Sequence, residues 1–139
     1  MKAEIEALLP HRTPFLFVDE VRTENGLIIA SHTFTENEFF FKGHFPQYPV
    51  VPGVILIETM AQSGGAGLRG EGVLGGDALF FLASVDKVKF RRQVRPGETV
   101  RSEISNLRIS SKMIKQAGKA YVGDEVAAEA EWLCLVGSA

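Results

Sequence analysis

The segment VILIETMAQSGGAGL at 54–68 most constrains what this chain can fold into, because it is apolar on nearly every side through residue 61. The prolines at 46, 49 and 52 keep the preceding stretch extended, since each removes an amide donor, and Pro52 also suits the first turn of a helix. A helix that is apolar all round has no face to present to water. The sequence therefore predicts one long helix that begins near Pro52 and is enclosed by other elements.

The segments on either side predict a sheet that encloses this helix. A short helix is expected at 2–9, where Pro10 ends the pattern, and the glycine-rich stretch 70–77 is expected to form a loop. Strands are predicted at 15–21, 27–34, 78–85, 87–94, 99–110 and in two runs around the Gly123-Asp124 turn. This order favours an α+β fold, with one antiparallel sheet around the central helix and a single domain over 1–139.

Composition narrows the class of protein. The chain has 139 residues, 45% of them hydrophobic, and a formal charge of −2, so nothing in the total charge attracts nucleic acid or an anionic membrane. Cys134 is the one cysteine, which excludes a disulfide within the chain. Without a secretory or membrane-spanning pattern, we expect a soluble cytoplasmic protein. Three scattered histidines and one cysteine predict no metal site.

Glu58 is the charged residue inside the apolar run. In a helix it shares a face with Val54, Ala61 and Gln62, so Gln62 lies within hydrogen-bond reach of the carboxyl group. Burial should raise the pKa of Glu58 unless a cation or several donors hold its charged form. A carboxyl group with a raised pKa can act as a general acid near neutral pH.

His44 and the start of the helix could complete a site. Glu58 lies roughly 9 Å inside the helix, so His44 of the same chain is not certain to reach it, and a neighbouring subunit could supply the partner. Gly53 and Val54 offer unpaired backbone N–H groups to a ligand. A base, an acid and an oxyanion donor would suit removal of a proton beside a carbonyl group. A glutamate paired with Gln62 and a histidine that only packs explain the same residues.

The chain resembles the β-hydroxyacyl-acyl-carrier-protein dehydratases of the FabZ type. The resemblance rests on LLPHRTPFLFVDEV at 8–21, GHFPQYPVVPGVILIETMAQSGG at 43–65, FLASVDKVKFRRQVRPGE at 81–98 and GDEVAAEAEWLC at 123–134. It implies the hotdog fold and the loss of water from 3-hydroxyacyl thioesters to give trans-2-enoyl thioesters. No cofactor is implied, because the substrate carries its own phosphopantetheine arm.

The resemblance also assigns roles to residues. It implies that His44 is the catalytic histidine and Glu58 the catalytic carboxylate, contributed by different subunits of a homodimer. Gly53 would bind the thioester carbonyl through its N–H, next to Val54, and Gln62 would orient Glu58. Such dimers often assemble into a trimer of dimers. Departures at Thr13, Gln47, Tyr48 and Val51, and in the 70–77 loop, leave the shape of the acyl tunnel open.

An acyl carrier protein is the implied partner, and it is strongly acidic. A basic region that could meet it follows the predicted strand at 78–85. We expect docking by some of its cations, which are Lys87, Lys89, Arg91, Arg92 and Arg95. The first three are predicted to project from one strand face while Val88 and Phe90 pack inward.

Other interpretations remain. A hotdog thioesterase would hydrolyse the thioester, and a catalytically silent subunit would bind the carrier without reacting. The HFP-to-glutamate arrangement argues against the first, and the presence of both His44 and Glu58 argues against the second. His11 and His32 are expected to be structural or exposed, with a modest positional role for His11 because it lies in the matching LPHR segment. Cys134 is expected in the core.

Overall fold

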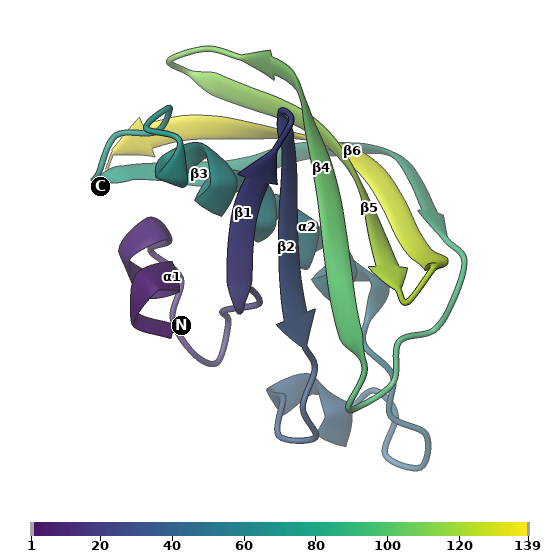
Figure 1. Ribbon diagram of the computed structural model, residues 1–139. Helices are drawn as coiled ribbons and strands as arrows, with labels where there is room; N and C mark the ends of the chain where they lie inside the picture. Colours follow the sequence, from purple (N-terminus) through teal and green to yellow (C-terminus); the bar gives the residue numbers. More distant parts are fainter. Residues whose placement is uncertain (1, 139) are drawn as a thin grey trace.

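The computed structural model describes residues 2–138, in which one antiparallel sheet curves over a long helix (Figure 1). The elements are α1 (Lys2–Leu8), β1 (Glu20–Glu24), β2 (Leu27–Thr33), the 3-10 helix η1 (Phe39–Lys42), α2 (Gly53–Gly70), β3 (Ala78–Phe90), β4 (Thr99–Ile109), β5 (Met113–Val122) and β6 (Glu125–Ser138). The six strands lie in the order β1-β2-β4-β5-β6-β3. This α+β architecture is the hotdog arrangement that the sequence predicted.

The core lies between the sheet and α2. Buried and less buried residues alternate along β2, β4 and β5, so one face of the sheet packs on the helix while the other faces solvent. Trp132, Ile104 and Ile114 are among the fully buried side chains that this face contributes. From Ile55 to Leu68 only Glu58 is not buried. The carboxyl group is thus the one break in an enclosed helix.

Gly64 lets the sheet approach α2 closely. A methyl group at this position would lie 2.1 Å from Oε1 of Gln116, a residue that is fully buried on β5. Gln116 accepts a hydrogen bond from Trp132 Nε1 at 3.2 Å and donates to Asn106 Oδ1 at 2.8 Å. The glycine is therefore needed for space, and a satisfied polar group fills the space it leaves.

Two strand predictions were wrong in their bounds. Residues 15–19 precede β1 and are not in a strand, because Phe17 N–H donates to the side chain of Gln62 at 2.8 Å instead of to a neighbouring strand. The two strands predicted at 78–85 and 87–94 are one bent strand, β3, which ends at Phe90. Its register shifts between Asp86 and Lys89, and Lys87 has a φ of 53°.

The bend also alters which side chains of β3 point inward. Val88 packs against the core as predicted, but Phe90 is 52% exposed and lies over Gly53. β3 is an edge strand, because it pairs with β6 alone. Phe81, Leu82 and Leu135 add further exposed apolar surface on this edge and on the strand beside it. Such an edge presents unpaired backbone N–H and C=O groups beside exposed apolar side chains.

His32 is structural, as expected, and it joins three segments. Its Nδ1 lies 2.8 Å from Asp19 Oδ1 and its Nε2 lies 3.3 Å from Glu38 Oε2. Burial alone would lower the pKa of His32, but the two carboxylates outweigh it and raise the pKa to about 9. Burial would likewise raise the pKa of Asp19, yet His32 and Thr33 N–H hold it below its usual value. The protonated imidazole thus ties β2 to the segments that lead into β1 and η1.

Stability should fall as pH rises because of this histidine. A folded pKa of about 9 against 6.5 in the unfolded chain gives a contribution that is complete below pH 6.5 and lost on the way to pH 9. At about 1.4 kcal/mol per pKa unit, this contribution is on the order of 3 kcal/mol. Urea unfolding of wild type and His32→Gln between pH 6 and pH 9.5 measures it, and parallel curves for the two proteins would contradict it.

Candidate active site

Glu58 lies in the second turn of α2 with its side chain 22% exposed. Gln62 Nε2 donates to Glu58 Oε2 at 2.9 Å, the contact that the four-residue spacing predicted. Burial raises the pKa of Glu58, and the hydrogen bond from Gln62 offsets only part of that rise. The pKa of Glu58 is therefore raised, which favours the neutral acid, the form that a general acid requires.

Gln62 is fully buried and its amide orientation is fixed by the backbone. Phe17 N–H donates to Gln62 Oε1 at 2.8 Å, and Gln62 Nε2 donates to Phe15 O at 3.1 Å. An N–H group can only donate and a carbonyl oxygen can only accept, so these two contacts determine which end of the amide is nitrogen. The second N–H of Gln62 must then point at Glu58 Oε2. In the neutral acid, the proton of Glu58 lies on Oε1.

His44 lies in the loop after η1 and is half-buried. Its backbone N–H donates to Phe40 O at 3.0 Å, and its O accepts from Val50 N–H at 2.8 Å. The ring nitrogen Nδ1 lies 3.1 Å from Val50 O. A carbonyl oxygen accepts only, so Nδ1 carries the proton and Nε2 is left as the basic nitrogen. The loop therefore presents an imidazole in the tautomer of a general base.

The two residues do not meet within one chain. Within residues 2–138, no hydrogen bond or ion pair joins His44 to Glu58; the first contacts Val50 and the second contacts Gln62 and His11. The doubt about reach that the sequence raised is thus justified for a single chain.

His11, for which the sequence predicted only a modest positional role, lies beside Glu58. Its Nε2 lies 3.5 Å from Glu58 Oε2, and its ring packs at 5.6 Å from that of Phe80. Burial, and then the charge of Arg12, lower the pKa of His11, so it is neutral at pH 7. Forty-seven residues separate it from Glu58. No local spacing could reveal the contact, although His11 does lie in one of the matching segments.

The start of α2 opens on a cavity of about 560 Å³. Val50, Gly53, Val54 and Phe90 are among its lining residues. A methyl group on Gly53 would lie 2.8 Å from the ring of Phe90, so any larger residue requires this exposed ring to move. Val54 is 71% exposed. The helix N-terminus is thus accessible, as the predicted role of Gly53 and Val54 requires.

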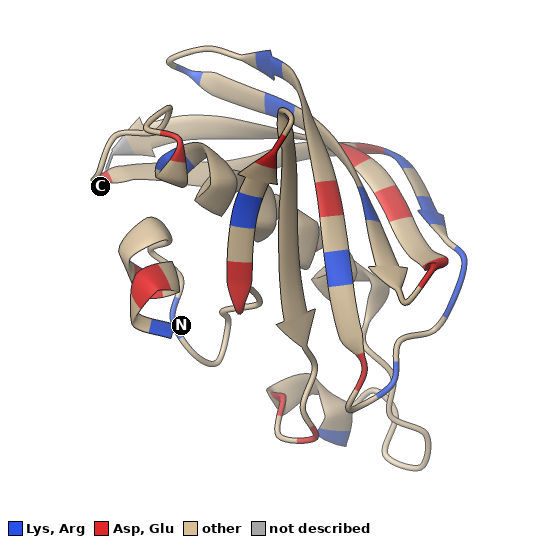
Figure 2. Ribbon diagram, viewed as in Figure 1, with Lys and Arg blue, Asp and Glu red and all other residues tan. Residues whose placement is uncertain are grey.

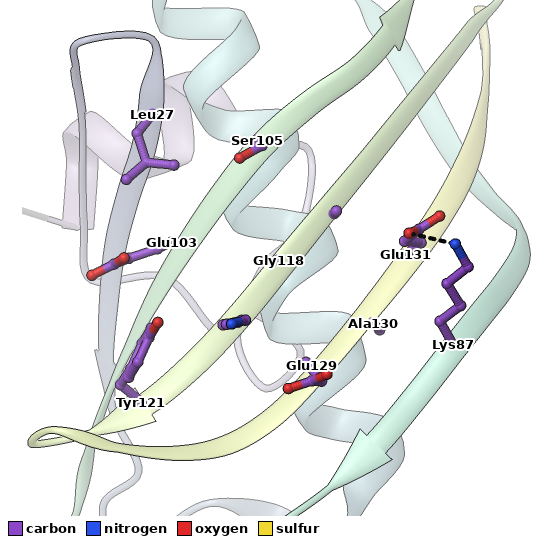
Figure 3. Close-up of a pocket in the computed structure, with 11 residues that line it drawn as sticks. Leu27, Lys87, Glu103, Ser105, Gly118, Tyr121, Glu129, Ala130 and Glu131 are labelled. Atoms are coloured by element: carbon purple, nitrogen blue, oxygen red, sulfur yellow. Dashed lines mark ion pairs between the residues drawn. The ribbon is translucent and has the colours of Figure 1, made fainter.

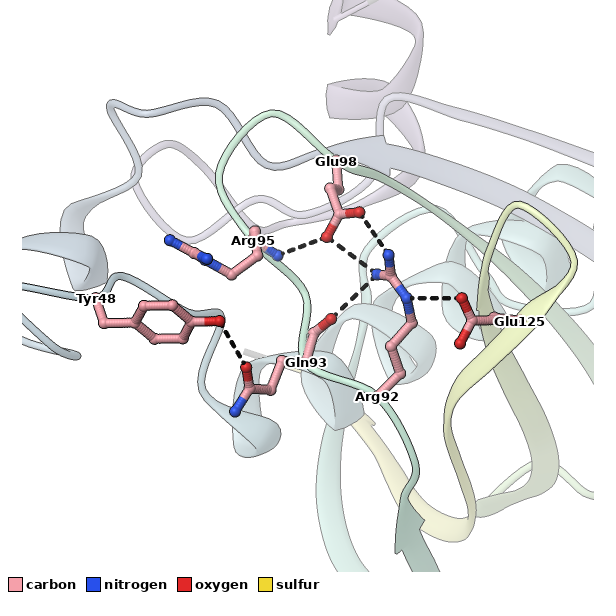
Figure 4. A network of polar contacts seen from close by, with 6 residues as sticks. All are labelled: Tyr48, Arg92, Gln93, Arg95, Glu98 and Glu125. Carbon is pink, nitrogen blue, oxygen red and sulfur yellow. Dashed lines mark hydrogen bonds and ion pairs between the residues drawn. The ribbon is translucent and has the colours of Figure 1, made fainter.

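Figure 2 shows that basic and acidic residues are interspersed over the molecule. The basic region is more extensively paired than its sequence suggested. Arg92 donates to both oxygens of Glu98, at 3.0 and 2.8 Å, and approaches Glu125 at 3.4 Å (Figure 4). Arg95 donates to Pro49 O at 2.8 Å and stacks on the ring of Tyr48 at 3.8 Å. These contacts hold the loops on either side of the cavity mouth together.

The cations of β3 and the residue after it face carboxylates of β6. Arg91 Nε lies 3.0 Å from Glu129 Oε2. Lys87 Nζ lies 3.3 Å from Glu131 Oε2 (Figure 3). For Lys89 the described chain contains no ion pair within 4.0 Å. The sequence pointed only to the nearby acidic residues Asp86, Glu98 and Glu103 as opponents, because partners across a sheet are distant along the chain. Lys89 stands opposite Glu129 in the strand register but makes no ion pair of its own within the described chain.

The hollow in Figure 3 lies on the outer face of the sheet, where Glu103, Gly118 and Tyr121 are among its lining residues. His44, Gly53, Glu58 and Gln62 do not line it. The described residues hold no group of three or more His, Cys, Asp or Glu side chains that could bind a metal ion. Nor does any helix among them have the length and apolarity to cross a membrane.

The sequence of this chain is similar to those of known dehydratases. A family model described as the FabA-like domain matches residues 9–131. The chain is 44% identical to the 3-hydroxyacyl-[acyl-carrier-protein] dehydratase FabZ of Desulforamulus reducens, over 96% of this chain and 94% of that protein. It is 47% identical to the protein of the same name from Caulobacter vibrioides, over 96% and 86% respectively.

Solved structures show the same fold. The dehydratase heterocomplex ApeI:P of Xenorhabdus doucetiae contains a chain with a TM-score of 0.80 at 18% identity, covering 96% of this chain and 91% of that one. A thioesterase of Haemophilus influenzae has a TM-score of 0.59 at 12% identity, covering 87% and 77%. The sheet and its enclosed helix define a hotdog-fold protein. The chain belongs to the FabA-like family and, within it, to the FabZ type.

Proposed function

We propose that this protein is a 3-hydroxyacyl-[acyl-carrier-protein] dehydratase, a hydro-lyase that converts 3-hydroxyacyl thioesters into trans-2-enoyl thioesters during acyl-chain synthesis. One observation of the site supports acid catalysis directly. Glu58 is a half-buried carboxyl group with a raised pKa, and Gln62 occupies one of its oxygens, so the proton lies on the other. The full-length likeness to FabZ dehydratases supports the same reaction.

The mechanism assigns one step to each group. His44 Nε2 removes a proton from C2 of the substrate, which the adjacent thioester makes acidic. The charge that develops on the thioester oxygen is stabilised by Gly53 N–H at the start of α2, with Val54 beside it. Glu58 Oε1 gives its proton to the departing hydroxyl group, which leaves as water. No cofactor takes part, because the substrate brings its own phosphopantetheine arm.

A homodimer supplies His44 and Glu58 to one site from different subunits. Two observations support this part of the proposal. The two side chains make no contact within one chain, and β3 offers a long edge with exposed Phe81 and Leu82. Pairing of two such edges would bury this surface in a closed two-fold assembly. Three dimers could then form a hexamer, with one hotdog domain in each chain, acting in the cytoplasm.

Mixed subunits should recover activity if sites are shared. A dimer of one His44→Ala chain and one Glu58→Gln chain has one site with both residues intact and one site with neither. Random reassociation of the two inactive variants should therefore give roughly a quarter of wild-type activity, since about half the dimers are mixed. The variants are denatured together, refolded and assayed. Activity no greater than that of the separate variants would show that each chain uses its own pair.

The acyl carrier protein is expected to dock on the basic region near the cavity, where Lys89 is free of ion pairs and Arg91, Arg92, Arg95 and Lys87 set the positive field. Lys89→Glu should raise KM for a carrier-bound substrate about two- to fivefold, the effect of one exposed charge pair. The effect should shrink with added salt. Lys112→Glu makes the same charge change at the opposite end of β6. An equal effect of both changes would contradict docking at Lys89.

A direct assay tests the reaction. Purified protein with a 3-hydroxyacyl carrier thioester should produce the enoyl thioester, which is followed by its absorbance. Release of free thiol without enoyl product would instead identify a thioesterase, and binding of the carrier without either product would identify a silent subunit. Substrates of several chain lengths in the same assay define the acyl preference.

A further inference from the structure

His11 is the residue besides Gln62 that approaches the carboxyl group of Glu58. It lies in the segment between α1 and β1, far from the helix along the chain, and its side chain is 19% exposed. Both Gln62 Nε2, at 2.9 Å, and His11 Nε2, at 3.5 Å, approach Oε2. The two nitrogens thus converge on one oxygen and leave Oε1 to the substrate.

The surroundings of His11 decide its tautomer. Nδ1 is buried and has no hydrogen-bond partner. An unpaired acceptor nitrogen is tolerated better in the interior than an unpaired N–H, so the proton of the neutral ring belongs on Nε2. Nε2 is also the ring nitrogen that lies 3.5 Å from Glu58 Oε2. At 3.5 Å the contact is long for a hydrogen bond and acts through its dipole, and it can shorten as charge develops on the carboxyl group.

We propose that His11 is a positioning residue for Glu58, whose Nε2–H, together with Gln62, keeps Oε2 as the accepting oxygen and so holds the transferable proton on Oε1. The inference rests on the proposed dehydratase function. His11 touches neither reacting atom, but it would fix where the proton is and stabilise the carboxylate that forms when the proton leaves. Loss of this donor would give a weaker acid whose proton is less well placed.

Few other titratable groups of the described chain lie near this pair, and in the proposed dimer His44 of the partner subunit also faces Glu58 but is the same in every variant compared. Arg12 neighbours His11 and lowers its pKa. From β6, Cys134 lies close enough that burial and the charge of Glu58 together raise the pKa of its thiol to about 11. Cys134 is therefore neutral throughout the range in which Glu58 titrates, and Arg12 keeps its charge. A change in the titration of Glu58 on replacing His11 is thus assignable to His11.

The test compares His11→Leu with His11→Gln. Leucine removes the donor, whereas the amide of glutamine can place an N–H near the position of Nε2. In His11→Leu we expect kcat to fall about three- to tenfold, the effect of one hydrogen bond to a group that becomes charged, with KM little changed. The alkaline limb of the kcat–pH profile should move to higher pH, because a carboxylate without this donor is less stable. His11→Gln should restore both quantities to within about twofold of wild type.

A second measurement does not depend on turnover. Carbon-13 titration of the Glu58 carboxyl group should give a higher pKa in His11→Leu than in wild type or His11→Gln. An unchanged titration in His11→Leu, or an equal change in both variants, would overturn the positioning role even if the wild type proved active. If the wild type does not dehydrate the substrate, the proposed function fails, and the titration still decides whether His11 acts on Glu58.

Discussion

Replacing Glu58 with glutamine lowers kcat for dehydration of a 3-hydroxyacyl thioester by about 10²–10⁴-fold, the usual contribution of a positioned general acid. The replacement keeps the shape of the side chain. Its carbonyl oxygen can accept from Gln62 Nε2 as Oε2 does now, which leaves an NH₂ group where Oε1–H stood. That group can donate a hydrogen bond but cannot release a proton. Binding of the substrate should therefore survive while the chemical step is lost.

The measurement is steady-state turnover with KM and kcat determined separately, alongside thermal unfolding to show that the variant folds. His44→Ala should lose a similar factor, because it removes the base. Gln62→Leu offers a contrast. It leaves the acid in place but removes three hydrogen bonds, so it should destabilise the fold as well as slow the reaction. Turnover within threefold of wild type in both Glu58→Gln and His44→Ala would refute the mechanism.

Gly64→Ala should lower the free energy of unfolding by about 2–3 kcal/mol. The new methyl group would lie 2.1 Å from Gln116 Oε1, so the buried amide must move and leave Trp132 Nε1 without its acceptor. An unsatisfied buried donor costs about 1–3 kcal/mol, and overpacking adds a similar amount. The better helix propensity of alanine returns only about 1 kcal/mol. Urea unfolding at a fixed protein concentration measures the difference.

Gly70→Ala is the matched control for this prediction. It makes the same substitution in the same helix, but the nearest atom to the new methyl group would be Leu8 Cδ2 at 4.0 Å. Its effect should be within about 0.5 kcal/mol of zero, or slightly stabilising. If both variants lost the same stability, the cost would come from the helix itself and the packing of Gln116 would play no part.

The parts of the site that were predictable from the sequence are those that depend on the spacing of residues along one helix. Gln62 follows Glu58 by four residues, and an isolated acid in an enclosed helix implies a raised pKa. The order of the strands and the turn at Gly123-Asp124 were equally local, and β5 and β6 flank that turn. Local periodicity and turn chemistry were enough for these features.

The parts that were not predictable depend on contacts between distant segments. The run 15–19 has the composition of a strand, but its amide and carbonyl groups bind the Gln62 side chain. Phe90 alternates like a core residue, yet a register shift turns it toward Gly53. The pairing of Lys87 and Arg91 with Glu131 and Glu129 was missed, because these carboxylates lie some forty residues further along the chain. Each of these outcomes depends on which distant segments the fold places next to one another, and the sequence of a single segment does not determine that.

The hydrogen bonds of the Gln62 amide make the position of the Glu58 proton depend on how the N-terminal segment packs. Its oxygen and both of its N–H groups are used, two of them by the backbone of Phe15 and Phe17. Without contacts from that N-terminal segment, the Gln62 amide can rotate. Neither oxygen of Glu58 is then fixed as the one that carries the proton. Competence for proton transfer therefore requires that the N-terminal segment is packed on α2. A chain with a correct sheet and helix but a detached N-terminal segment would be folded and inactive.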